Sequence, residues 1–190
     1  GSSFPAMSFL LETSSPFILA AGRFSLAALL AVIWCINNHK QKIKLNHLLR
    51  YFFAGFIGIF LYNLFLNHGQ ESVSAGAGSF IVNCNPLFTA LIGFFILKQK
   101  VSYIHWLGII ICMFGVGLIS FDQEGGLNLG SGSSLILFAA ILTAIYFHIV
   151  KPLVVLYGAI TSTAYTIIFG TIPMLFCCLL YTSDAADEFS

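Results

Sequence analysis

Long apolar intervals separated by short polar connections are the main pattern of this sequence. A helix that spans a membrane needs about 20 mostly apolar residues, at a rise of about 1.5 Å per residue. The charged residues bracket uncharged stretches of this length and do not recur at helical or strand spacing. The pattern predicts six complete spans, at residues 16–36, 50–67, 73–97, 101–121, 132–150 and 158–180.

The apolar intervals favour helices over the strands of a β-barrel. In hydrocarbon every backbone amide must be satisfied within its own segment or in a closed barrel, and barrel strands alternate apolar and polar residues over about ten positions. Runs such as LGIIICMFGVGLISF, residues 107–121, do not alternate. The expected fold class is therefore all-α, a polytopic transmembrane helix bundle.

Composition agrees with a lipid environment. Hydrophobic residues make up 58% of the chain and charged residues 8%, whereas about a quarter of a soluble domain is charged. Gly1 to Leu11 is apolar but too short to cross a bilayer, and we interpret it as the tail of another span. A signal peptide is the alternative there, but the stretch lacks a basic n-region.

The basic residues predict the orientation of the chain. If the connection from Asn37 to Arg50 is cytoplasmic, then KQK at residues 98–100 and Lys151 also lie inside, and every Lys and Arg apart from Arg23 is on that side. The opposite connections hold Glu12, Glu71, Asp122 and Glu124. This asymmetry follows the positive-inside rule, because short loops rich in Lys and Arg resist translocation. A basic patch for nucleic acid is the alternative that we set aside.

Small residues indicate how the spans pack together. Apolar side chains have no preference for one another over lipid tails, so helices in membranes associate through close backbone approach at Gly, Ala and Ser. AGAG at residues 75–78, Gly55 with Gly58, and Gly115 with Gly117 offer such surfaces. They indicate a bundle without indicating what it does.

Several motifs, taken in order, resemble the EamA-type carriers of the drug/metabolite transporter superfamily. GSSFP at 1–5 resembles the end of that family's first helix, and SPFILAAGRF at 15–24 its second, with Arg23 as its arginine. SAGAGSFIVNCNPLFTALIGFFIL at 74–97 is similar to the fourth helix, and LGIIICMFGVGLI at 107–119 to the fifth. Where the family usually has a GER-like turn, this chain has Lys98, Gln99 and Lys100.

The resemblance implies ten helices arranged as two inverted five-helix repeats, of which the second is truncated here. Residues 1–121 would be the first repeat with an incomplete first helix, 122–131 an outer loop, and 132–180 the start of the second repeat with two helices. Residues 181–190, YTSDAADEFS, match nothing in the family, and we interpret them as a truncation or a non-native junction.

Signatures of an enzyme are missing from the sequence. It contains no H-E-x-x-H, G-x-S-x-G or P-loop motif and no pair of carboxylates within a span. The histidines are scattered near span ends, where interfacial or packing roles are ordinary. The cysteines form no C-x-x-C pair and are expected to pack as small apolar residues. We expect no catalytic residue, no metal and no cofactor.

Polar residues inside the spans are the candidates for a substrate path. Arg23 lies about 10 Å into its span, where a cation is either functional, paired with a structural partner, or snorkelling to the interface. On the span at 73–97, Ser79, Asn83 and Pro86 recur at helical spacing, and Pro86 removes a backbone donor near mid-membrane.

The span at 50–67 is expected to supply the other wall of a cavity. Tyr62, Asn63 and Asn67 lie at a depth similar to Ser79 and Asn83 if the two spans are antiparallel. Asn85, about 200° around the helix from Asn83, is expected to face away from the cavity. Interhelical hydrogen bonding without any ligand is the alternative reading of these polar groups.

We therefore predict transport of a small organic solute by alternating access, with amino acids, metabolites and drugs, often moved outward, as the substrates that the resemblance implies. A non-transporting membrane scaffold or assembly subunit is the alternative, and a membrane-embedded enzyme comes third. Expected partners are a small-molecule substrate and the lipid bilayer, with a homodimer left open and nucleic acid excluded. The expected location is the cell membrane, as in a bacterial inner membrane, with residues 37–50 and 98–100 in the cytoplasm.

Overall fold

The structure is a computed structural model that describes residues 16–37, 43–100, 102–122 and 130–187. Three expectations fall partly or wholly outside this range. They are the interpretation of residues 1–11 as the tail of a span, the position of Lys40 and Lys42 in the first connection, and most of the outer loop at 122–131.

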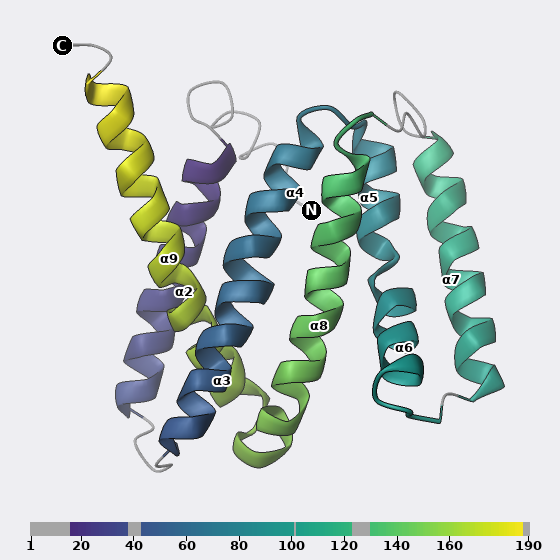
Figure 1. The fold of residues 1–190 in the computed structure, drawn as a ribbon, viewed down its shortest axis with the longest axis horizontal. Helices are drawn as coiled ribbons and strands as arrows, with labels where there is room; N and C mark the ends of the chain where they lie inside the picture. Colours follow the sequence, from purple (N-terminus) through teal and green to yellow (C-terminus); the bar gives the residue numbers. More distant parts are fainter. Residues whose placement is uncertain (1–15, 38–42, 101, 123–129, 188–190) are drawn as a thin grey trace. The chain divides into compact units, whose positions relative to one another are not determined.

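Helices make up nearly all of the described chain (Figure 1). They are α2 (Pro16–Asn37), α3 (Leu45–Gly55), the π-helix η1 (Phe56–Leu61), α4 (Tyr62–Gln70), α5 (Ala75–Asn83), α6 (Asn85–Phe95), α7 (Tyr103–Asp122), α8 (Ser133–Tyr157) and α9 (Ala159–Asp187). No strand occurs among the described residues. The predicted all-α polytopic fold is confirmed.

Five stretches are long and apolar enough to cross a membrane, at Ala20–Asn37, Leu45–Gln70, Ala75–Phe95, Ser133–Tyr157 and Ala159–Cys178. They correspond to five of the predicted spans. The remaining predicted span, at 101–121, is the helix α7, whose apolar part at Tyr103–Leu118 is shorter than the other five stretches. Helix α9 continues to Asp187, beyond the predicted end of the last span at 180.

The span predicted at 73–97 differs from the structure, where it is two helices instead of one. Helix α5 ends at Asn83, and α6 begins at Asn85 with Cys84 in a turn between them. The Cys84 N–H donates to the Ile81 carbonyl at 3.1 Å, which tightens the last turn of α5. Pro86 then falls in the first turn of α6, where its missing N–H costs no helical hydrogen bond.

The described helices group into two compact units. One comprises residues 1–60 and 153–190, and includes α2, α3, the last turn of α8, and α9. The other comprises residues 61–152, with α4 to α7 and most of α8. Because both boundaries fall inside helical stretches, this division differs from the predicted inverted repeats, which stay a prediction.

In the first unit, α9 packs against α2 and α3 (Figure 1). The buried Tyr51 hydroxyl lies 2.9 Å from the Ser162 Oγ, and the Tyr51 ring stacks on Tyr165 at a centroid distance of 5.5 Å. One turn further on, Gly55 and Gly170 meet so closely that a Cβ on Gly55 would lie 2.6 Å from the Gly170 nitrogen. Because neither glycine has a side chain, the backbones of α3 and α9 can come into contact.

In the second unit, the end of α4 packs against the start of α8, and α5 packs against α7. The Gly132 N–H, just before α8, donates to the Ser72 Oγ at 2.9 Å. A Cβ on Gly69 would lie 2.5 Å from the Ile136 side chain, so glycine is needed for this approach. These contacts join two connections that the predicted topology puts on the same side of the membrane.

Large apolar side chains cover outward faces of the helices. Exposed fractions reach 70% at Leu26 on α2 and 79% at Ile104 and 69% at Phe114 on α7. An exposed apolar surface of this extent is unfavourable in water and favourable in hydrocarbon. The chain is accordingly a multi-pass membrane protein.

Candidate functional site

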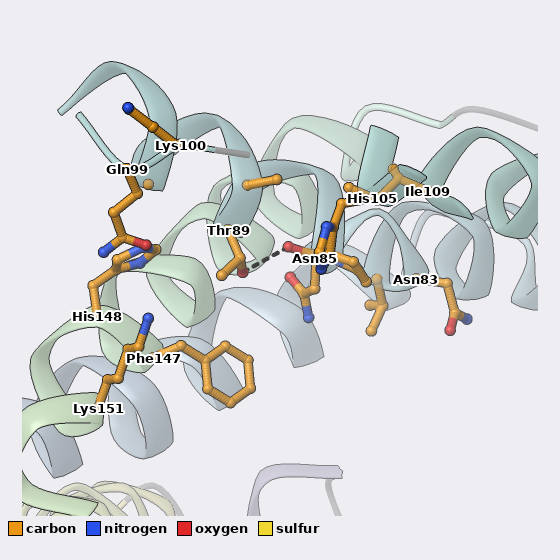
Figure 2. A pocket seen from close by; sticks show the side chains of 14 residues that line it. Asn83, Asn85, Thr89, Gln99, Lys100, His105, Ile109, Phe147, His148 and Lys151 are labelled. Atoms are coloured by element: carbon orange, nitrogen blue, oxygen red, sulfur yellow. Dashed lines mark hydrogen bonds between the residues drawn. The ribbon is translucent and has the colours of Figure 1, made fainter. Parts of the chain in front are cut away.

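A cavity of about 810 Å³ lies within the second unit, among the α5–α6 break, the start of α7 and the end of α8 (Figure 2). Its volume is in the range of pockets for drug-sized ligands. The residues that line it are Val82, Asn83, Asn85, Pro86, Thr89, Ala90, Gly93, Gln99, Lys100, His105, Ile109, Phe147, His148 and Lys151.

One end of the cavity is shaped by the turn that ends α6. Lys98 has a left-handed backbone, with φ of 51°, and the Gln99 N–H donates to the Gly93 carbonyl at 2.9 Å. This turn folds the chain back over the last turns of the helix. A Cβ on Gly93 would lie 3.3 Å from the His148 Nε2 and 3.5 Å from the Gln99 Oε1. Because Gly93 has no side chain, Gln99 from the connection after α6 and His148 from α8 can come together.

His148 and Lys151 come from the last turns of α8 within this unit. The His148 Nδ1 lies 2.8 Å from the Ala144 carbonyl oxygen, which can only accept, so Nδ1 carries a proton and donates. The Nε2 atom is left as the free ring nitrogen toward Gly93 and Gln99. Figure 2 shows that the Lys151 side chain extends toward His148 and Gln99, whereas the end of Lys100 points away from them.

The break between α5 and α6 supplies further polar groups to the lining. The Thr89 Oγ1 donates to the Asn85 backbone carbonyl at 2.8 Å, the bond drawn in Figure 2. The Asn85 Oδ1 is buried and has no hydrogen-bond partner in the structure. A buried amide oxygen without a partner costs about 1–3 kcal/mol. A ligand that donates a hydrogen bond there would recover part of that cost.

The lining is basic at one end and apolar along its wall. Lys100 and Lys151 carry positive charge, and no Asp or Glu is among the residues that line the cavity. Glu71 is outside the lining and follows the C-terminal end of α4, where its Oε1 atom lies 4.0 Å from the His68 Nδ1. Among the described residues, no three His, Cys, Asp or Glu side chains come together as a group that could hold a metal ion.

Two of the residues predicted for a substrate path line this cavity, Asn83 and Pro86. Ser79 does not line it, but its carbonyl accepts a hydrogen bond from the Asn83 Nδ2 at 2.8 Å. The Asn83 amide group is therefore already engaged with its own helix, and its side chain is exposed.

The remaining predicted residues lie elsewhere. Tyr62, Asn63 and Asn67 are on α4 and are not among the lining residues, although the Asn67 Nδ2 is buried without a hydrogen-bond partner in the structure. Arg23 is an exposed residue of α2, in the other unit. Within the second unit the structure thus brings Asn83 and Pro86 together at the cavity, and the α4 residues do not line it.

Asn85 departs from its expected orientation, because it lines the cavity together with Asn83. The expectation used the rotation of about 100° per residue of a continuous helix. That relation does not carry across the turn at Cys84, where α5 ends and α6 begins. The two asparagines therefore face the same space from different helices.

Sequence reasoning missed further polar residues of the lining, which are Gln99, Lys100, His105, His148 and Lys151. It interpreted the lysines as an orientation signal and the histidines as interfacial. The predicted topology nevertheless put all of them at the cytoplasmic ends of the last three spans in the second unit. Their shared depth was the signal that could have identified them.

Comparisons with known proteins agree with this architecture. Residues 1–121 match the EamA-like transporter family. The chain is 33% identical over 174 residues to the uncharacterized transporter YdfC of Bacillus subtilis (strain 168), covering 92% of this chain and 57% of that protein. It is 30% identical over 175 residues to an uncharacterized transporter of Archaeoglobus fulgidus, with coverages of 92% and 61%.

A more distant relative has a more specific description. The probable terminal-alkyne amino-acid exporter of Streptantibioticus cattleyicolor is 23% identical over 174 residues, covering 92% of this chain and 58% of that protein. The chain thus spans less than two thirds of the length of each of these relatives. A solved crystal structure has the same fold, with a TM-score of 0.71 at 15% identity, covering 89% of this chain and 59% of that one. On the match over residues 1–121, the chain belongs to the EamA-like transporter family.

Proposed function

We propose that the full-length carrier moves a small organic solute across the membrane by alternating access, in the outward direction, and that the cavity in the second unit is part of its solute path. The observation that carries this proposal is the cavity itself, with about 810 Å³ of space and polar groups from the four helices α5, α6, α7 and α8. Family membership supports transport, and the similarity to a probable amino-acid exporter supports the direction.

The inverted repeats are part of the same proposal. Residues 1–121 would form the first repeat and residues 132–180 the first two helices of the second, joined by the outer loop at 122–131. Carriers with such repeats bind their solute near the interface of the two halves and rock one half against the other. Glycines that allow close helix approach, as at Gly55 and Gly170, would supply stiff contacts around which such movement takes place.

A transport role explains features that a scaffold or an enzyme leaves unexplained. A scaffold gains nothing from a buried Asn85 oxygen without a partner, because that group lowers stability. No Asp, Glu, Ser or Cys lines the cavity beside His148, and the Thr89 hydroxyl in the lining already donates to the Asn85 carbonyl. We therefore favour a carrier that is neither an enzyme nor a scaffold and that does not bind nucleic acid.

We also propose that the connection at residues 98–100 and the end of α8 face the cytoplasm of a bacterial inner membrane. Lys100 and Lys151 line one cavity, so these two basic segments lie at the same end of the second unit. A membrane protein retains such basic segments on the cytoplasmic side. The first connection, at 37–50, would lie on that side as well.

Cysteine labelling tests this orientation. In a full-length carrier whose native cysteines are replaced, Lys98→Cys should resist a membrane-impermeant maleimide added to intact cells, and Glu71→Cys should react with it. Both positions are exposed, so a difference between them reports the side of the membrane and not burial. Strong labelling at residue 98 from outside would reverse the proposed topology.

Release of solute from proteoliposomes tests the transport function. Vesicles that contain the full-length carrier are loaded with a mixture of amino acids and organic acids, and the external medium is followed by mass spectrometry. We expect saturable release of at least one solute, above the rate of protein-free vesicles. Equal release from both kinds of vesicle for every solute, with correctly folded carrier, would contradict the proposal for these solute classes.

A further inference from the structure

We propose that the cavity selects amphipathic organic acids, with the anionic group at Lys151 and the apolar body along the wall formed by Pro86, Ile109 and Phe147. This inference rests on the proposed function, because it names the solute class of the same cavity. It goes further than that function because it excludes cationic solutes and assigns recognition of the anionic group to residues at the end of α8.

The charge of the lining is the first argument. Lys100 and Lys151 are its ionised residues, and no carboxylate among the lining residues offsets them. At about 4 Å two unit charges interact by roughly 1 kcal/mol in water and several times more near a protein surface. A cationic solute would be repelled at this end, whereas an anion would gain a partner there.

The geometry around Lys151 is the second argument. Lys151 lies three residues after His148, so both side chains project from one face of α8. Figure 2 shows Lys151 extending toward the side chains of His148 and Gln99. Lysine, histidine and glutamine can all offer N–H donors to an acid oxygen, in the case of His148 when Nε2 is protonated. A carboxylate or phosphate at this place could be contacted from α8 and from the turn after α6.

The apolar wall is the third argument. Ile109 from α7 and Phe147 from α8 line the same cavity as the lysines, as does Pro86 from α6. Burial of an apolar body is worth about 25 cal/mol per Å². An anion as small as acetate would leave this wall uncovered, so a larger acid with an aromatic or aliphatic body fits the lining better.

Binding can be measured on this chain, since all lining residues lie within residues 82–151. The chain is placed in nanodiscs of phosphatidylcholine, which carries no net charge, and titrated calorimetrically with 4-phenylbutyrate, 4-phenylbutanol and 4-phenylbutylamine. Empty nanodiscs supply the correction for partitioning into lipid. We expect the acid to bind at least about tenfold more tightly than the alcohol, with the amine weakest.

Variants identify the group responsible. Lys151→Gln should weaken binding of 4-phenylbutyrate by about five- to thirtyfold, within the range for hydrogen bonds to charged groups. Lys98→Gln removes the same charge from a residue that does not line the cavity, and should change binding less than about twofold. Lys151→Glu should reverse the order, so that the amine binds better than the acid. Circular dichroism with thermal melting shows whether each variant is folded.

The source of the anionic group needs a separate arm, because anionic lipid headgroups share this chemistry. Phosphatidylglycerol is added to the nanodiscs at increasing fractions. If the cavity takes soluble acids, 4-phenylbutyrate still binds, with at most a modest loss of apparent affinity. If 4-phenylbutyrate does not bind and phosphatidylglycerol is instead retained by the chain in a manner lost in Lys151→Gln, the assignment to a solute is overturned.

Further outcomes separate this inference from the proposed function. Equal affinity for the acid and the alcohol, or an equal effect of the Lys98 and Lys151 variants, overturns the selection of acids. The full-length carrier could still release other solutes in the vesicle assay, and the transport proposal would then stand alone. Binding of the acid without any release by the full-length carrier would instead count against transport.

Discussion

Replacement of Gly55 by alanine should destabilise the packing of α3 against α9 by about 3 kcal/mol, near the upper end of the usual cost of overpacking. The new Cβ would lie 2.6 Å from both the Gly170 nitrogen and the Thr166 carbonyl oxygen. These are backbone atoms, so a rotation of a side chain cannot relieve the overlap and the helices must separate. Unfolding of the purified chain in detergent, titrated with sodium dodecyl sulfate, measures the change.

Two further substitutions make this prediction sharper. Gly170→Ala should have a similar effect, because its Cβ would lie 2.7 Å from the Ile59 Cβ and 2.8 Å from the Gly55 carbonyl oxygen. Gly22→Ala on α2 is the matched control, since no atom lies within 4 Å of the added carbon. Alanine favours the helix over glycine, so the control should be neutral or slightly stabilising. Equal unfolding midpoints for Gly22→Ala and Gly55→Ala would refute the close contact.

Substitution of Ala90 by tryptophan should abolish solute release by the full-length carrier. Ala90 lines the cavity on α6, one turn after Pro86, and an indole there would take up much of the space that a solute needs. Loss of more than about 95% of the initial rate is expected, while the amount of carrier in the membrane stays comparable. The measurement is the proteoliposome assay, normalised to reconstituted protein.

Leu107→Trp is the control for this variant. Leu107 is 58% exposed on α7 and does not line the cavity, so the same bulk is added to an outward, apolar surface. This variant should keep most of the wild-type rate. If Ala90→Trp released solute as fast as Leu107→Trp, the cavity could not be part of the solute path, even if the carrier is a transporter.

The helices themselves were predictable because the bilayer imposes a simple rule on sequence. Apolar intervals of about 20 residues must become helices to satisfy their backbone groups, and five predicted spans correspond to membrane-length stretches of the structure. The ends were less predictable, as at α9, which continues to Asp187. A helix ends where its backbone groups find other partners, and hydropathy does not specify that position.

The turn at Cys84 shows where local reasoning from sequence stops. Pro86 was recognised as a residue that disturbs hydrogen bonding, and a continuous helix with one carbonyl freed was the expected result. The structure instead ends α5 and starts α6 with the proline in its first turn. A kinked helix and a broken helix both accommodate proline, and the surrounding packing selects one of them. The orientation of Asn85 follows from that choice.

The amino-acid sequence by itself determined that the chain is a helical membrane protein, which parts of it span, and which family it resembles, because these depend on composition and on short-range order. Tertiary structure decided which polar residues share a cavity. Gln99 precedes His148 by 49 positions in the chain, and the two meet because Lys98 reverses the backbone and Gly93 leaves room beside His148. Contacts of this kind depend on the relative rotation and depth of packed helices, which hydropathy does not specify.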